Sequence, residues 1–216
     1  MSQPAKRLKV DEKAAWLEAR LQLLEEEKAL SKQVAEVAAK RQALPRLEVP
    51  DYDLQGPEGA VKLSSVFGDH DQILVQHMMF ADGWEKPCPM CSAWVDMISG
   101  TFPHVKSRCG YVVVGKAPFE QVAAAAAAKG WNTDEIKFLS AGASSFNEDC
   151  GVSFSKEEVE SKSAVYNYNR TWSYGTEAPG FSVFYKDSET GKIYLTYSTF
   201  AAGLASLSMM HNILDM

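Results

Sequence analysis

Two cysteines three residues apart, Cys88 and Cys91, most constrain the fold and chemistry open to this chain, because an apolar stretch precedes them and a helix-like stretch follows. Residues 72–80 are typical of a strand that is buried on both faces, and residues 93–98 favour a helix. The first turn of a helix offers unpaired N–H groups and a partial positive charge, which favour a thiolate over a thiol. The second thiol can then attack a mixed disulfide. This order of elements predicts a dithiol redox centre.

Other uses of such a pair are a zinc site or two inert thiols. Zinc requires two more ligands at suitable spacing. Cys109 lies in an apolar stretch that predicts a buried small side chain, Cys150 stands alone in a polar loop, and no His-x3–5-His pattern is present. We therefore predict no metal, and we keep inert thiols in a binding domain as the alternative.

The formal net charge of −6 argues against a protein that coats nucleic acid, since such proteins are usually basic. No run approaches the roughly 18 apolar residues that span a membrane, and residues 1–10 lack the apolar core of a secretory signal. We expect a cytoplasmic protein, in which reduced cysteines are the rule. The basic cluster at 4–10 resembles a weak nuclear-import signal, although a solvated tail is the simpler interpretation.

The 216 residues allow one domain of generous size with appendages. We expect a disordered tail at 1–10, a helical extension at 11–45 and a single domain at 46–216. The extension is rich in helix formers, with Asp11 as its N-cap and Pro45 as its stop. At ~1.5 Å per residue, a helix over 11–44 would span about 50 Å. It could be an arm for homodimerisation, or it could pack along its own domain.

The remaining strands and helices are predicted from the spacing of apolar residues and from turn-forming residues. Strands are expected within 47–54, 60–63, 72–80, 109–115, 136–139 and the two arms of a hairpin at 179–199, and helices at 93–106, 118–129 and 201–214. The helix at 118–129 contains six consecutive alanines, which suit close packing on a sheet. Residues 141–165 look irregular. Right-handed strand–helix–strand crossovers followed by a hairpin predict a mixed α/β sheet with helices on both faces.

This order, with Cys-x-x-Cys at a strand–helix junction and a proline opening the hairpin, resembles the thioredoxin fold. Residues 52–67 look like the corresponding region of peroxiredoxin-type members of that superfamily. More narrowly, the chain resembles the DUF899 family of thioredoxin-like proteins over residues 12–214. The shared motifs are Trp16-Leu17-x-Ala19-Arg20, His77-Met78-Met79-Phe80, Trp84-Glu85-x-x-Cys88-Pro89-x-Cys91-Ser92, Tyr166-Asn167-Tyr168, Pro179 to Asp187, and Tyr197-Ser198-Thr199.

The thioredoxin resemblance implies that Cys88 attacks a disulfide and that Cys91 resolves the intermediate. It also implies that Pro179 is the cis-proline that faces the dithiol and presents backbone to the substrate. Two departures stand out, because Pro87 replaces the usual tryptophan before the first cysteine and Pro89-Met90 replaces Gly-Pro. The peroxidatic motif of peroxiredoxins, with Pro and Thr ahead of one cysteine, is not evident, so a thiol peroxidase ranks third.

Other side chains are candidates near this centre, each with a simpler structural interpretation. Trp84 and Pro89 could contact substrate, or they could simply pack and turn the chain. Supporting roles are predicted for His77, Glu85, Tyr166, Tyr168 and Arg170. A histidine or carboxylate could move a proton during exchange, whereas a hydrogen-bonded structural histidine is the default.

The sequence thus predicts a thiol–disulfide oxidoreductase acting on a protein or small-molecule disulfide. No dinucleotide or phosphate-loop motif is present, so a separate thiol reductant is expected and no cofactor. No nucleic acid or membrane partner is predicted. The second hypothesis is a non-catalytic thioredoxin-like interaction module that assembles through residues 11–44.

Overall fold

The computed structural model describes residues 10–215. The tail and basic cluster predicted at 1–10 therefore lie outside the described residues, apart from Val10. The chain divides into two compact units, one ending at Leu44 and one beginning at Pro45. No helix in the described part of the chain is long and apolar enough to cross a bilayer.

The first unit is one helix, α1, over Val10–Gln42. It begins one residue before the predicted cap and ends two residues before Leu44. Ion pairs along its surface join Arg20 to Glu27 and Lys28 to Glu25, and such exposed pairs add little stability. Self-association through this helix stays a prediction.

The second unit is built on an eight-stranded mixed sheet in the order β1-β10-β9-β4-β5-β6-β2-β3. The strands are β1 (Leu47–Val49), β2 (Asp53–Gly56), β3 (Gly59–Lys62), β4 (Gln72–His77), β5 (Gly110–Gly115), β6 (Lys137–Ser140), β9 (Gly180–Lys186) and β10 (Ile193–Phe200). β4, β5 and β6 are parallel, and the other pairings are antiparallel. A separate hairpin pairs β7 (Val165–Tyr166) with β8 (Arg170–Thr171).

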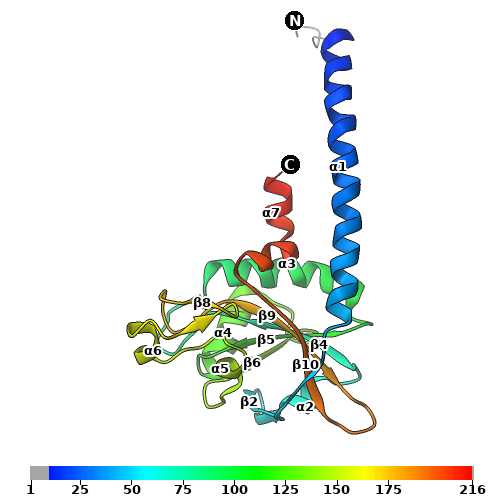
Figure 1. Ribbon diagram of the computed structural model, residues 1–216. Coiled ribbons are helices and arrows are strands. Elements are labelled where there is room, and N and C mark those ends of the chain that lie inside the picture. The colour runs from blue at the N-terminus through cyan, green and yellow to red at the C-terminus, as the bar shows by residue number, and fades with distance from the viewer. Residues whose placement is uncertain (1–9, 216) are drawn as a thin grey trace, which may run out of the picture. The chain divides into compact units, whose positions relative to one another are not determined.

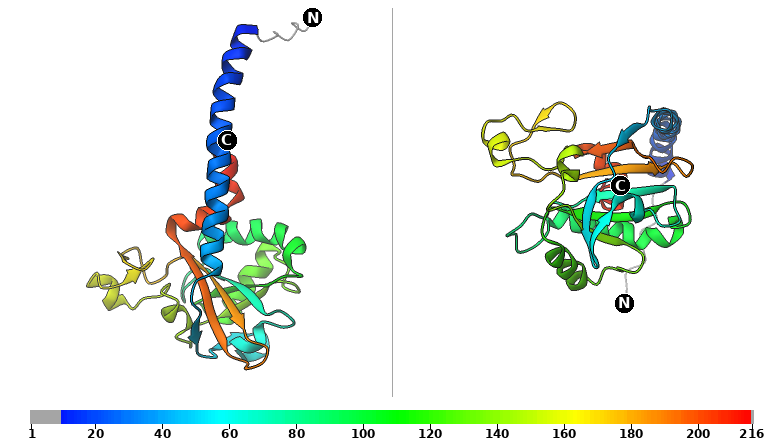
Figure 2. Two further views of the ribbon diagram at one scale, coloured as in Figure 1. Left: turned by 45° about the vertical axis from the view of Figure 1, so that its right-hand side comes forward. Right: turned by 90° about the horizontal axis from the view of Figure 1, so that it is seen from below.

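Helices cover both faces of this sheet (Figures 1 and 2). α3 (Pro89–Val105) and α4 (Phe119–Lys129) pack on one face, where Trp94, Val95 and Val122 join one apolar core. α2 (Leu63–Val66) and α5 (Phe146–Asp149) contribute to the core on the other face. The predicted α/β architecture is confirmed: a mixed sheet flanked by helices, with an N-terminal helix.

Three local predictions differ from the structure. The first strand is two strands, β1 and β2, because Pro50 lacks the N–H that would continue the ladder. The region 141–165 contains α5 and α6 (Lys156–Glu160), whose N-cap Ser155 forms a capping box with Glu158. The last helix is split into a 3-10 helix, η1 (Ala201–Leu207), and α7 (Met209–Leu214), because the Ser208 side chain caps a new helix.

The alanine run of α4 meets the sheet with one face only. Val122 and Ala126 are fully buried, whereas Ala124 and Ala128 are exposed. Gly130 ends the helix in the left-handed conformation, with φ of 67°, which glycine adopts without strain. The small side chain at 126 thus lets α4 lie close to the sheet.

This packing predicts that Ala126→Leu destabilises the protein by about 1–3 kcal/mol, because extra methylenes are forced into a filled core. Ala128→Leu is the matched control and should change the free energy of unfolding by less than about 0.5 kcal/mol. Urea unfolding of both variants checks this. Equal stabilities would contradict the close packing.

Candidate functional site

The site begins where the chain leaves β4 and enters α3. The Cys88 N–H donates to the Met79 carbonyl at 2.9 Å, and Cys88 is the N-cap of α3. Pro89 follows at the first helical position, where its missing N–H costs nothing and its fixed φ suits a helix. This junction places the Cys88 sulfur at the end of the helix that carries unpaired N–H groups.

The two thiols differ sharply in environment. Cys88 is half-buried, Cys91 is 1% exposed, and all four cysteines of the chain are free. The Cys91 thiol donates a hydrogen bond to the Cys88 sulfur, and with the N–H groups of Cys91 and Met90 it lowers the pKa of Cys88 to about 6 against the effect of burial. The same hydrogen bond, together with burial, raises the pKa of Cys91 well above its usual range. Cys88 is therefore the thiolate at neutral pH, and Cys91 keeps its proton.

A buried polar pair lies beneath this turn. The Gln76 side-chain amide donates to the Cys91 carbonyl at 2.7 Å, and the Tyr111 hydroxyl donates to the Gln76 side-chain oxygen. Gln76 and Tyr111 are no more than 2% exposed, so their bonds are shielded from water. The sequence analysis missed both residues, although a glutamine in an otherwise apolar strand was a usable signal.

Pro179 is held by Tyr166. The Tyr166 hydroxyl donates to the Pro179 carbonyl at 2.6 Å and accepts the Ala201 N–H at 2.9 Å. Residues 10–215 contain no cis peptide bond. Pro179 therefore follows a trans bond, and the cis geometry implied by the thioredoxin resemblance is corrected here.

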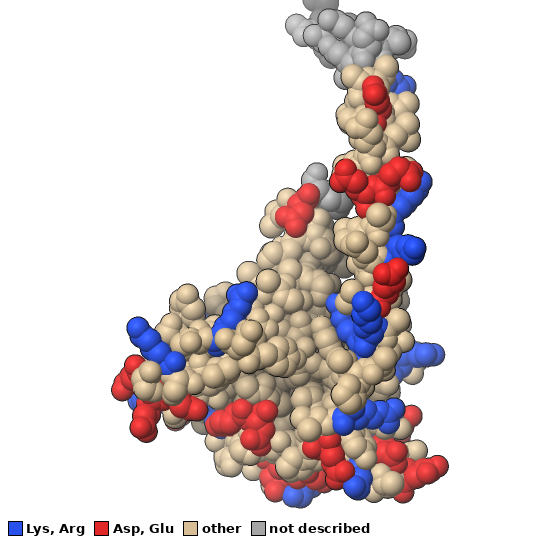
Figure 3. All heavy atoms as spheres, viewed as in Figure 1, with Lys and Arg blue, Asp and Glu red and all other residues tan. Residues whose placement is uncertain are grey.

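The other predicted residues are spread along the surface. Trp84, Glu85 and Pro89 are exposed in the loop and first turn that flank Cys88. Tyr168 is 74% exposed and donates to the Ser198 carbonyl at 3.1 Å, whereas Arg170 lies exposed on β8. In the view of Figure 3, acidic side chains gather along the lower edge of the domain and the band below α7 is largely uncharged.

His77 lies on the other face of the sheet. Successive side chains of a strand point to opposite faces, so Gln76 reaches Cys91 while the His77 ring lies 5.6 Å from that of Phe146 in the other core. Its ring nitrogens contact the Ser182 hydroxyl at 2.9 Å and the Asn147 side-chain oxygen at 3.4 Å. Burial lowers the pKa of His77 to about 4. The structure therefore does not bring this neutral histidine to the dithiol.

The remaining cysteines are separate from the pair. Burial raises the pKa values of Cys109 and Cys150, so both remain thiols near neutral pH. Within residues 10–215, no three His, Cys, Asp or Glu side chains lie close enough together to hold a metal ion.

One buried acid near Pro179 escaped the sequence analysis. Glu177 is 4% exposed and accepts a hydrogen bond from the Ser153 hydroxyl at 2.6 Å. Burial raises the pKa of Glu177 to about 7, partly offset by the Ser153 hydrogen bond and the Lys116 charge. Folding therefore disfavours the ionised form of this carboxyl.

We expect Glu177→Gln to have little effect near pH 4, where the acid is protonated in the folded and unfolded states. As pH rises from 4.5 to 7 the wild type loses stability through this carboxyl, so the variant should become more stable than the wild type by about 3 kcal/mol at pH 8. Urea unfolding across pH measures the difference, with the exposed Glu120→Gln as control. A difference that does not change with pH would contradict the buried acid.

Comparison with known proteins gives one family and several distant structures. No curated protein matches the chain. Prx3 of Vibrio vulnificus, solved reduced and with hydrogen peroxide, is 13% identical, with a TM-score of 0.48 over 74% of this chain and 89% of its own. A peroxiredoxin Q mutant of Xanthomonas campestris is 13% identical, with a TM-score of 0.48 over 78% and 96%. BsSco, of the Sco family of cytochrome c oxidase assembly proteins, is 15% identical, with a TM-score of 0.38 over 75% and 92%.

The model of one family matches almost the whole chain. It is described as "Bacterial protein of unknown function (DUF899)" and matches residues 5–216. The resemblance read from the motifs of the sequence is thereby confirmed. The chain belongs to the DUF899 family.

Proposed function

We propose that this protein is a thiol–disulfide oxidoreductase that uses Cys88 and Cys91 as its dithiol. The observation that carries the proposal is the unequal pair at the start of α3: a half-exposed sulfur with a lowered pKa beside a buried thiol that donates to it. A thiolate is the attacking species in disulfide exchange. Its pKa near 6 keeps it largely ionised at cytoplasmic pH, the compartment that the sequence predicts.

The reaction balances within the pair and its substrate. The Cys88 thiolate attacks one sulfur of a substrate disulfide, and the other substrate sulfur leaves as a thiolate that takes up a proton. Cys91 then loses its proton and attacks the Cys88 sulfur, which releases the second substrate thiol and leaves a Cys88–Cys91 disulfide. Two electrons have passed to the substrate. A separate thiol reductant returns the pair to the dithiol.

Residues around the two cysteines would position the sulfurs and the substrate for these steps. Gln76 donates to the Cys91 carbonyl and is itself held by the Tyr111 hydroxyl, so this pair fixes the first turn that carries both sulfurs. Tyr166 holds the Pro179 carbonyl, leaving the backbone after this proline in a defined place for a substrate chain. Trp84 and Pro89 are exposed beside Cys88 and would form the rest of the contact surface.

The direct test is the reduction potential of the pair, measured by equilibrating the protein in glutathione buffers and counting free thiols. We expect a reversible two-electron transition between about −270 and −180 mV. If the two thiols never pair over that range, the redox proposal fails and a non-catalytic interaction module replaces it. Sulfenic acid at Cys88 after peroxide treatment would instead indicate a thiol peroxidase.

Substitution of the cysteines should separate their roles. We expect Cys88→Ser to abolish disulfide reduction, because no attacking sulfur remains, and Cys91→Ser to accumulate a mixed disulfide at Cys88, because the resolving sulfur is gone. Turnover of an insulin or small aromatic disulfide, with mass spectrometry of the trapped species, reads this out. Cys109→Ser is the control and should keep full turnover. Full activity in Cys88→Ser would sink the proposal.

The ionisation of Cys88 is measurable on its own. We expect the rate of iodoacetamide alkylation at Cys88 to rise with pH around a midpoint of about 6, because only the thiolate reacts. In Cys91→Ala the midpoint should rise, since the hydrogen bond that lowers this pKa most is lost. Peptide mass spectrometry assigns the alkylated residue. A wild-type midpoint near the usual thiol value would contradict the proposed activation.

A further inference from the structure

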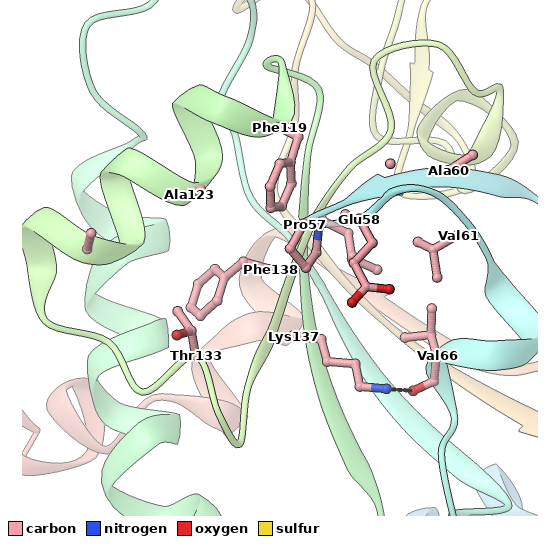
Figure 4. Close-up of a pocket in the computed structure, with 14 residues that line it drawn as sticks. Pro57, Glu58, Ala60, Val61, Val66, Phe119, Ala123, Thr133, Lys137 and Phe138 are labelled. Carbon is pink, nitrogen blue, oxygen red and sulfur yellow. Dashed lines mark hydrogen bonds between the residues drawn. The ribbon is translucent and has the colours of Figure 1, made fainter.

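A cavity of about 610 Å³ lies at the β2–β3 edge of the sheet, and no residue of the dithiol region lines it. It is bounded by the β2–β3 hairpin, by α4 and by β6, and its walls include Phe119, Phe138, Val61 and Val66. Figure 4 shows the two phenylalanines on the α4 side and the two valines on the opposite side. Cavities of about 300–1,000 Å³ with mostly apolar walls are typical of small-molecule sites.

Small residues on both walls keep this space open. Ala123 and Ala127 face it from α4, and Gly56 and Gly59 border it from the hairpin. Gly59 has φ of 98°, where a larger residue would be strained, and a Cβ at Gly56 would meet Leu139 Cδ2 at 3.1 Å. Gly59 is therefore kept for its backbone conformation and Gly56 for its close packing on Leu139, while α4 presents alanines where longer side chains would fill the cavity.

One charged group is fixed at the cavity wall. The Lys137 ammonium donates to the Val66 carbonyl at 2.9 Å (Figure 4), and an ammonium has further donors for a second partner. The other nearby charge is Glu58, which stands exposed at the tip of the hairpin. Among residues 10–215, its carboxylate has no hydrogen-bond or ion-pair partner. The Lys137 ammonium is thus held in place by a hydrogen bond, whereas the Glu58 carboxylate is not.

We propose that this cavity binds an amphipathic organic anion, with its apolar body against Phe119, Phe138, Ala123 and Ala127 and its acidic group on Lys137. Apolar walls favour the body by burial of its surface. A fixed ammonium favours a carboxylate over a neutral or cationic head group. The site is independent of the proposed redox activity, because none of its lining residues belongs to the dithiol region.

Isothermal titration calorimetry with decanoate and with decylammonium, on the full-length protein, tests the proposal. Decanoate should bind at least about tenfold more tightly than decylammonium, because Lys137 attracts one head group and repels the other. Glu58→Gln should tighten decanoate binding, since a repelling carboxylate is removed. Tighter binding of decylammonium, or no binding of either probe, would overturn the proposal.

Matched variants place the binding site. Ala123→Leu and Ala127→Leu should each weaken decanoate binding at least about tenfold by filling the cavity. Ala124→Leu and Ala128→Leu, at positions of the same helix that do not line the cavity, should leave it unchanged. Lys137→Met should weaken decanoate binding about fivefold or more and leave decylammonium no weaker. Circular dichroism confirms that each variant is folded. Equal effects at all four alanines, or none at Ala123 and Ala127, would refute binding in this cavity.

Discussion

The hydrogen bond from the Cys88 N–H to the Met79 carbonyl joins the segment just after β4 to the start of α3. The redox proposal depends on this junction, because it sets the Cys88 sulfur among the unpaired N–H groups of the helix. Gln76 donates to the Cys91 carbonyl in the same turn, and the Tyr111 hydroxyl donates to the Gln76 side-chain oxygen.

The contrast between the pKa values of the two thiols comes first from the hydrogen bond between them and then from the deeper burial of Cys91. A hydrogen bond between two thiols can favour ionisation of only one of them, and the half-exposed Cys88 loses less hydration on ionising than the buried Cys91. In the proposed reaction, the attacking role of Cys88 and the resolving role of Cys91 follow from this contrast. The Tyr166 hydroxyl donates to the Pro179 carbonyl, and the next residue, Gly180, pairs with His77 at the end of β4.

The two faces of the sheet place neighbouring residues in different surroundings, and the cavity lies at one of its edges. Gln76 and His77 are neighbours in sequence, yet strand alternation sends one to the dithiol and the other to a neutral, hydrogen-bonded place in the opposite core. The alanine run of α4 likewise serves two surfaces, since Ala126 packs on the sheet and Ala123 and Ala127 border the cavity. Neighbouring residues in one element therefore lie in unrelated surroundings.

The sequence by itself determined the α/β architecture and the cysteine pair at a strand–helix junction, because apolar periodicity and turn residues are local signals, and its motifs carried the resemblance to the DUF899 family. It could not place His77, because one residue of strand register decides which face a side chain reaches. It did not reveal Gln76, Tyr111 or Glu177, whose burial and partners come from segments far apart in the chain. The cavity, too, exists only because α4, β6 and the β2–β3 hairpin meet at one edge of the sheet. Contacts of this kind join segments far apart in the chain, so no local pattern in the sequence reveals them and only the packed structure decides them.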